Sequence, residues 1–220
     1  MPRPPPVTSA VRPSRLSISA PYARARSTQA RRLAAWLGPD TVLTQEPGGT
    51  EIGRAIRSLL LDHGPHAVAP AAEVLLFFAD RAQHVAELVR PALQAGRSVV
   101  SDRYTDSSLA YQGYGRGIDR ALILAVARLA TGGLQPDLTI LLDLPVDVGL
   151  ARAGRRGPQD RLESEVREFH DRVRAGYLEM AGAEPARWIR VDAEGHADDV
   201  ARRVLRAAEA RGLVGRHAVP

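Results

Sequence analysis

Short apolar runs alternate with longer segments of helical periodicity along most of the chain. Strands are expected at residues 41–44, 98–102, 138–144 and 188–191. Helices are expected at residues 27–37, around Ile52 to Leu60, from Pro70 to an interruption at Pro91, and at 121–131, 147–153, 162–180 and 197–211. This alternation predicts an α/β fold, in which a parallel sheet carries helices on both faces.

Polar motifs follow the predicted strands. They occupy residues 46–50, 102–104 and position Asp143. Ligands in parallel sheets bind beyond the carboxyl ends of the strands, so we expect these motifs to meet at one site.

The N-terminal segment has a different character. Residues 1–39 contain no Asp or Glu, and prolines crowd the start. The first dozen residues have little to bury and are expected to be disordered.

Composition narrows the classes of function. The formal net charge is +5 and the pI about 10.3, and every basic residue is arginine. No long basic run and no basic-aromatic interleaving occurs, which argues against a nucleic-acid binder. Cysteine is absent, which excludes disulfides and thiolate metal sites and suits the cytoplasm. No apolar stretch has the length of a membrane span, and no secretory signal is recognisable.

The motif Thr-Gln-Glu-Pro-Gly-Gly-Thr at 44–50 lies between a strand and a helix. Pro47 stiffens the turn, while Gly48 and Gly49 allow backbone amides to approach a ligand closely. Taken alone, this motif favours a plain β-α turn.

The motif at 77–84, Phe-Phe-Ala-Asp-Arg-Ala-Gln-His, places Phe77, Arg81 and His84 near one helical face. An aromatic ring beside a guanidinium suits a nucleobase. Alone, it favours a core phenylalanine and a surface arginine, and Phe78 is expected in the core.

The densest motif runs from 101 to 117. Asp102 can hold hydrated Mg²⁺, and Arg103 can fork onto a phosphate. Hydroxyl and amide groups suited to a sugar and base follow, at Ser107, Ser108, Tyr111 and Gln112. The alternative is an Asp-Arg ion pair that caps a helix, but the cluster of polar groups favours a binding site.

An arginine-rich, glycine-containing segment at 151–163 separates two predicted helices, as a mobile lid would. Its arginines could neutralise a transferring phosphoryl group. A solvated basic loop explains it equally well. The six histidines lack metal-ligand spacing, so none is assigned to a metal.

Together with residues 134–139 and 169–177, these motifs occur in the order and spacing of bacterial thymidylate kinases. The chain resembles that family from Ser27 to about Ala193, and the block from Asp-Arg-Tyr to Gly-Arg-Gly is specific to it. The resemblance implies a P-loop nucleoside monophosphate kinase with a parallel sheet of about five strands, helices on both faces and a short lid at about 152–161. It also implies a cytoplasmic homodimer that uses ATP and Mg²⁺ to convert dTMP to dTDP for dTTP synthesis.

The resemblance assigns roles to individual residues. Phe77 would stack on thymine, Arg81 would bond its carbonyl edge, and Tyr111 would sit where a 2′-hydroxyl would clash. The full implied dTMP set is Glu46, Pro47, Phe77, Arg81, Arg103, Ser107, Ser108, Tyr111 and Gln112. The implied catalytic residues are Arg103, Asp102 and Arg156, with Ser27 and Asp102 at the metal. ATP would meet Ala20, Ala25, Arg26, Ser27 and Thr28 at the P-loop position and Arg152, Arg155 and Arg161 in the lid.

Two positions depart from the family pattern. Gln45 stands where the family usually has an arginine that contacts the dTMP phosphate. Residues 20–26 stand where the family has Gly-x-x-x-x-Gly-Lys, but they read Ala-Pro-Tyr-Ala-Arg-Ala-Arg. Both glycines are missing and arginine replaces lysine, so this segment is not expected to cradle phosphates in the family's way.

Two interpretations explain the missing P-loop. In the first, residues up to about Arg26 are a frame-shifted translation of a GC-rich gene, since one set of codons for 20–26 encodes Gly-Pro-x-Arg-Ala-Gly-Lys in the neighbouring frame. In the second, the loop is genuinely degenerate, and the chain is a catalytically impaired relative that binds dTMP but not ATP. Either divides the chain into an aberrant, partly disordered segment 1–26, a kinase-like domain 27–212 and a tail 213–220.

Overall fold

A five-stranded parallel sheet forms the centre of the molecule. The computed structural model describes residues 14–19, 23–63, 67–154 and 160–215, without the side chains of 23–25. The strands are β1 (Arg15–Ser19), β2 (Val42–Gln45), β3 (Val99–Asp102), β4 (Leu138–Asp143) and β5 (Trp188–Asp192), in the order β2-β3-β1-β4-β5. This confirms the predicted α/β class and strand number, and adds the central strand β1, which the apolar pattern did not reveal.

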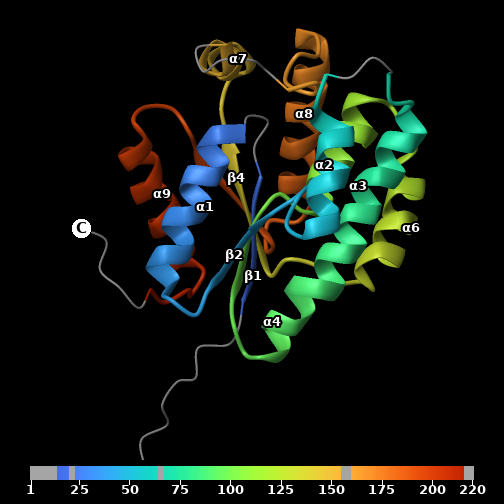
Figure 1. Cartoon of the computed structure of the whole chain (residues 1–220). Helices are drawn as coiled ribbons and strands as arrows, with labels where there is room; N and C mark the ends of the chain where they lie inside the picture. The colour runs from blue at the N-terminus through green and yellow to red at the C-terminus, as the bar shows by residue number, and fades with distance from the viewer. Residues whose placement is uncertain (1–13, 20–22, 64–66, 155–159, 216–220) are drawn as a thin grey trace, which may run out of the picture.

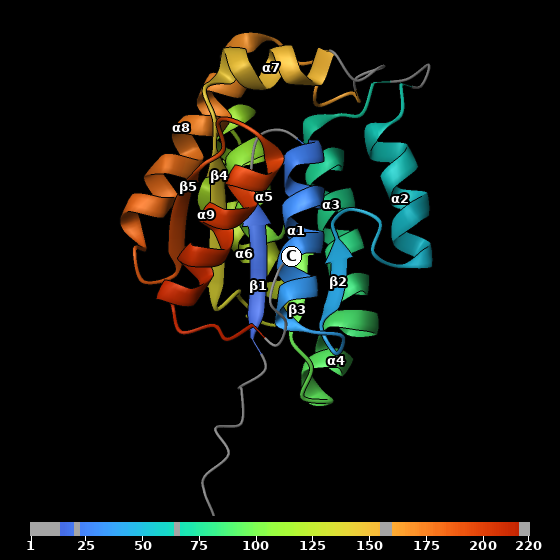
Figure 2. The ribbon, with the colours of Figure 1, turned by 90° about the vertical axis from the view of Figure 1, so that its left-hand side faces the viewer.

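Two helices cover one face of the sheet, α1 (Ala23–Leu37) and α9 (Ala197–Ala210). They lie side by side, to the left of the sheet in Figure 1 and toward the viewer in Figure 2. Leu16 and Ile18 of β1 pack there against Leu33 and Val204 in one apolar cluster. Burial of this face anchors β1 between β3 and β4.

The remaining helices lie over the opposite face and the carboxyl ends of the strands (Figure 1). They are α2 (Glu51–Leu61), α3 (Pro70–His84), the π-helical η1 (Val85–Val89), α4 (Arg90–Gln94), α5 (Thr105–Ser108), the π-helical η2 (Leu109–Gly115), α6 (Arg120–Thr131), α7 (Val146–Gly154) and α8 (Arg167–Ala183). Leu141, Tyr177 and Trp188 are core members on this face. Across the described ranges, no helix combines the length and apolarity that crossing a membrane requires.

Three differences between the helices and the sequence prediction have a local cause. Helix α1 begins at Ala23 instead of Ser27, because residues 23–26 are good helix formers without a glycine. Helix α8 begins at Arg167 instead of 162, because the Asp160 carboxylate caps the amides of the turn that precedes it. Pro91 does not interrupt the helix, since it lies in the first turn of α4, where its missing N–H costs no helical bond.

Strand β1 buries two hydroxyl groups, those of Ser17 and Ser19. Neither side-chain oxygen has a hydrogen-bond partner among the residues that the structure describes. A buried hydroxyl without a partner destabilises a fold by about 1–3 kcal/mol. The central strand is therefore less stable than an apolar strand in the same place would be.

Candidate functional site

One cavity opens at the carboxyl ends of β2 and β3 and collects the predicted dTMP residues. It is lined by Glu46, Pro47, Phe77, Arg81, Arg103, Ser107, Ser108, Tyr111 and Gln112, and also by Arg26, Ser27 and Asp102. Gln45, Arg57, Leu61, Asp160, Leu162 and Glu163 complete the lining. Residues from distant parts of the sequence thus form one pocket, where the topology of a parallel sheet places a ligand.

One end of the cavity is built around a buried arginine. Arg81 Nε donates to Glu46 Oε2 at 2.7 Å, and Arg81 Nη1 donates to Ser108 Oγ at 3.0 Å. The Arg81 guanidinium also lies over the ring of Phe78, 4.7 Å from its centroid. Phe77 lines the cavity beside Arg81 and is buried. A flat apolar ring and a fixed planar donor thus adjoin, which suits a nucleobase with carbonyl groups.

Glu46 is held by two partners from helix α3. Its Oε1 lies 2.7 Å from His84 Nδ1, and its Oε2 accepts from Arg81. Burial opposes ionisation, but Arg81 and His84 outweigh that effect and lower the pKa of Glu46. His84 is held in turn by Thr44, whose Oγ1 lies 2.7 Å from His84 Nε2. The charge of Arg81 is therefore balanced inside the protein, and its position is fixed.

The glycine turn after β2 is fastened to the same helix. Gly48 has φ +104° and donates its N–H to Asp80 Oδ1 at 2.9 Å. A Cβ at Gly49 would approach His84 Cδ2 to 2.6 Å. Burial of the Asp80 carboxyl raises its pKa to about 6. Both glycines are thus required by the packing of the turn. An approach of their amides to a ligand stays a prediction.

The other end of the cavity is cationic. Arg103 Nη2 donates to Tyr111 Oη at 2.9 Å, and its guanidinium lies 4.4 Å from the centroid of the Tyr111 ring. Arg103 has a positive φ of 77°, and among the described residues it is the one residue other than glycine that does. Such a conformation costs of order 1–3 kcal/mol and occurs preferentially at functional sites. Arg103 therefore presents a fixed charge directly after the buried strand β3.

The two predicted metal residues are adjacent. Ser27 Oγ donates to Asp102 Oδ2 at 2.5 Å. The other carboxylate oxygen, Oδ1, accepts from Arg26 Nε at 2.8 Å in an ion pair whose members are both buried. A hydroxyl beside a carboxylate suits hydrated Mg²⁺. Arg26, at the position of the P-loop lysine, is committed to this carboxylate.

The segment at 20–26 lacks the glycines of a phosphate-cradling loop. Only three residues separate the end of β1 at Ser19 from the start of α1 at Ala23. A phosphate-cradling loop needs glycine backbone and a longer connection, and this segment contains no glycine. Ala20 and the side chain of Ala25 lie outside the described residues.

Helix α7 and the segment before α8 hold the predicted lid arginines. Arg152 donates to the carbonyl oxygens of Ala193 and Gly195, at 3.0 and 3.3 Å. Arg161 binds Glu73 and the carbonyl of Leu60 and does not line the cavity. Thr28 lies in α1 away from the cavity. Arg155 and Arg156 lie outside the described residues. Contacts of these residues with ATP stay predictions.

Comparison with known proteins identifies the family. The family model described as thymidylate kinase matches residues 26–204. The chain belongs to the thymidylate kinase family. A thymidylate kinase from Desulfovibrio desulfuricans is 52% identical over 180 residues, covering 79% of this chain and 83% of the relative. One from a Synechococcus strain is 54% identical over 168 residues, covering 76% and 79%.

The solved structures agree. The crystal structure of thymidylate kinase from Ehrlichia chaffeensis superposes with a TM-score of 0.72 at 28% identity, over 88% of this chain and 97% of that one. The fold and the relatives are those of a nucleoside monophosphate kinase enzyme, as the sequence motifs predicted. The match to the family model begins at Arg26, so the segment that precedes it lies outside the match.

Two features of this thymidylate kinase site were not predicted from the sequence. Arg57 lines the cavity and donates to the Pro47 carbonyl at 2.8 Å. It lies four residues after buried Gly53 and three before buried Leu60, so an arginine on the inner face of α2 was the available signal. The second feature is the turn at 160–163, which contributes Asp160, Leu162 and Glu163 to the cavity. The sequence analysis marked the segment at 151–163 as a lid because of its arginines, and it named none of these three side chains as part of the site.

Proposed function

We propose that the cavity binds dTMP and that the reaction of this fold is phosphoryl transfer from ATP to dTMP, giving dTDP for dTTP synthesis. The observation that carries the proposal is the convergence of all nine implied dTMP residues on one cavity. Membership of the thymidylate kinase family supports it.

Different residues of the cavity would contact the base, the sugar and the phosphate of dTMP. Thymine would stack on Phe77 and bond Arg81, while Tyr111 would approach the deoxyribose. Arg103 would bind the phosphate with a charge-assisted bond, and Arg57 lies on the same cavity. Catalysis in such a site consists of positioning and charge neutralisation.

The part of the site that would hold ATP, the phosphoryl donor, matches its ligand less well than the part that would hold dTMP, the acceptor. Ser27 and Asp102 would hold Mg²⁺, which when bound neutralises charge on phosphate oxygens. The segment at 20–26 does not provide a phosphate cradle, and Arg26 is paired with Asp102. We therefore infer a second candidate function: the present chain binds dTMP but uses ATP poorly.

A frame-shifted translation up to about Arg26 is our preferred origin of this mismatch. Three observations support it: the absence of acidic residues from 1–39, a family match that begins at residue 26, and two buried hydroxyls in β1 that have no hydrogen-bond partner among the described residues. Resequencing the 5′ end of the gene tests it. An unambiguous reading frame that encodes the present residues 20–26 would contradict it.

We also propose that the protein is a homodimer. Exposed apolar side chains occur on the three neighbouring helices α2, α3 and α6 (Figure 1). They are Ile52, Leu59, Leu75, Leu122, Leu124 and Leu129. A second copy that covers them would remove this apolar surface from water.

Titration calorimetry with dTMP, ATP and a DNA oligonucleotide tests the proposed function. The structure of the cavity predicts measurable dTMP binding, weak ATP binding and no specific oligonucleotide binding. Tight ATP binding together with weak dTMP binding would contradict the assignment of the two halves. Oligonucleotide binding that exceeds dTMP binding would show that the arginine-rich composition serves nucleic acid.

A further inference from the structure

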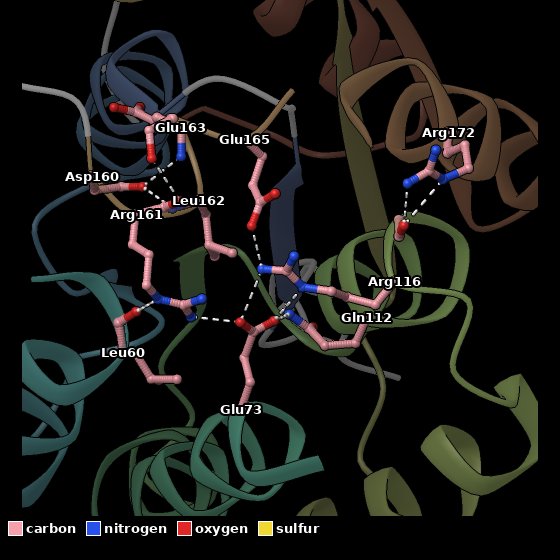
Figure 3. A network of polar contacts seen from close by, with 12 residues as sticks. Leu60, Glu73, Gln112, Arg116, Asp160, Arg161, Leu162, Glu163, Glu165 and Arg172 are labelled. Carbon is pink, nitrogen blue, oxygen red and sulfur yellow. Dashed lines mark hydrogen bonds and ion pairs between the residues drawn. The ribbon is translucent and has the colours of Figure 1, made fainter. Parts of the chain in front are cut away.

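Glu73, in the first turn of α3, lies at the centre of a polar network behind the cavity (Figure 3). Its side chain is buried, yet it does not line the cavity. The carboxylate accepts hydrogen bonds from three side chains, those of Gln112, Arg116 and Arg161. These donors hold the carboxylate in place, and the carboxylate in turn fixes the positions of the side chains that donate to it.

The first of these groups belongs to the cavity. Gln112 Nε2 donates to Glu73 Oε1 at 2.9 Å. An ionised carboxylate only accepts hydrogen bonds, so Gln112 must turn its amide nitrogen toward Glu73. The two ends of an amide point in different directions, so the carbonyl oxygen of Gln112 is turned away from Glu73. Gln112 itself lines the cavity, and it therefore offers an acceptor there.

The second group belongs to the turn that covers the cavity. Arg161 Nη2 donates to Glu73 Oε2 at 2.5 Å, and its Nε donates to the Leu60 carbonyl at 2.9 Å. The neighbours of Arg161 point the other way: Asp160, Leu162 and Glu163 line the cavity. Leu162 joins the apolar cluster that includes Phe77. The bond between Arg161 and Glu73 therefore holds the turn whose neighbouring side chains line the cavity.

A third group ties the network together. Arg116 Nη2 lies 3.2 Å from Glu73 Oε2 and 2.6 Å from Glu165 Oε1. Two guanidinium groups therefore face the Glu73 carboxylate. Burial opposes its ionisation, but the bonds from Gln112, Arg116 and Arg161 outweigh burial and lower the pKa of Glu73. Glu73 is therefore ionised at neutral pH, and both of its carboxylate oxygens accept hydrogen bonds.

We propose that Glu73 is a positioning residue that determines base specificity: it fixes Gln112 with its carbonyl oxygen toward the base and holds the 160–165 turn over the cavity. This rests on the proposed binding of dTMP. Thymine has an N–H at ring position 3, which this acceptor can bind, whereas cytosine has an unprotonated nitrogen there. The chain therefore selects a pyrimidine with a donor at that edge.

The first test is the Glu73→Gln variant, measured by calorimetry with dTMP and dCMP. A glutamine at 73 both donates and accepts, so Gln112 is no longer forced into one orientation. Loss of one oriented hydrogen bond predicts that the ratio of dTMP to dCMP affinity falls about tenfold. Glu179→Gln is the matched control, because Glu179 pairs with Arg120 and Tyr114 on the surface. It should leave the ratio unchanged.

The double variant Glu73→Gln with Gln112→Glu tests the same point by rescue. Residue 73 then donates to residue 112, which returns an acceptor to the cavity. The dTMP preference should recover, whereas a purely structural role for Glu73 predicts no recovery. Circular dichroism and urea unfolding establish that each variant folds. If Glu73→Gln does not fold, Gln112→Glu alone, which places two carboxylates together, should still lower dTMP affinity.

The turn is tested separately by Arg161→Leu. This variant should weaken dTMP binding without changing the dTMP to dCMP ratio, since Glu73 still holds Gln112. Amide hydrogen exchange at Leu162 and Glu163 should accelerate in both Arg161→Leu and Glu73→Gln, even without nucleotide. Unchanged exchange in both variants would overturn the positioning of the turn.

The outcomes separate the two proposals. If the unaltered chain prefers dTMP and Glu73→Gln keeps that preference, the role of Glu73 is wrong and the proposed function stands. If the unaltered chain does not bind dTMP, the proposed function fails, and the base-selecting role of Glu73 fails with it. In that case the exchange measurement still decides whether Glu73 holds the turn.

Discussion

Substitutions of Arg103 test two separate properties, the affinity for dTMP and the stability of a backbone with positive φ. Arg103→Ala and Arg103→Gly both remove the guanidinium that would bind the dTMP phosphate. A charge-assisted hydrogen bond is worth about 1.5–3 kcal/mol, so each variant should lose about 10- to 150-fold in dTMP affinity. The variants differ in stability, because residue 103 has φ +77°. A left-handed conformation costs a side chain with a Cβ roughly 1–2 kcal/mol, so the glycine variant should be more stable by about that amount.

Calorimetry with dTMP and urea unfolding measure the two effects in the same samples. The control is Arg155→Ala, because Arg155 belongs to the segment predicted to meet ATP and lies outside the described residues. It should leave dTMP affinity nearly unchanged. Equal losses for Arg103→Ala and Arg155→Ala would refute the placement of the dTMP phosphate. Equal stabilities of the alanine and glycine variants would refute the argument about the backbone.

Asp80, Ser17 and Leu129 are further positions at which a substitution has a measurable consequence. The pKa of Asp80 is raised from 3.8 to about 6, so its carboxyl favours the fold at low pH and that contribution is lost as pH rises through 6. Relative to Asp80→Asn, which keeps an acceptor for Gly48, the unaltered chain should lose about 2–3 kcal/mol of unfolding free energy between pH 4 and pH 8; a constant difference across that range would contradict the shift. Ser17→Ala removes a buried hydroxyl that has no partner among the described residues, and it should raise the unfolding free energy by about 1 kcal/mol in urea unfolding; a lower value would mean that the hydroxyl has a partner. Leu129→Glu, at a side chain that is 85% exposed, should weaken the proposed dimer in sedimentation velocity, while Val214→Glu on the C-terminal segment should not; equal effects would place the interface elsewhere.

Much of the fold was predictable because it depends on local periodicity. The strand at Leu138–Asp143 is buried along its whole length, as its continuous apolar run indicated. Helix α6 begins after Asp119, whose carboxylate caps it, and ends at Gly132 in the left-handed conformation. Such signals lie within a few residues of the element they define.

The burial of both faces of strand β1 could not be predicted in this way. The strand alternates Leu16 and Ile18 with Ser17 and Ser19, which is typical of a strand with one solvated face. Its position between β3 and β4 buries both faces instead. Only the tertiary arrangement determines that burial, and the serines give no local sign of it.

The site was predicted as a set of residues but not as a set of interactions. The motifs named Glu46 and Arg81, yet their 2.7 Å pairing joins residues 35 positions apart. The contact between Glu73 and Arg161 joins residues 88 positions apart, and no motif in the sequence indicates it. The family resemblance implied an ATP contact for Arg161, and the structure adds a bond from its side chain to Glu73. Charge and spacing predict which side chains bind, but the pairing of charges depends on the packed structure.

We propose that the dTMP half of the site is intact and that residues 20–26 limit the reaction. The most direct measurement replaces those residues with a Gly-x-x-x-x-Gly-Lys sequence and follows dTMP-dependent ADP release in a coupled assay. Glycine amides and a lysine would then face the phosphates at the start of α1, where the helix N-terminus favours anions. Charge stabilisation at such sites changes rates by orders of magnitude, so the repaired chain should be roughly a hundredfold faster or more, with unchanged dTMP affinity. A present chain that already matches the rate of the repaired one would contradict the claim.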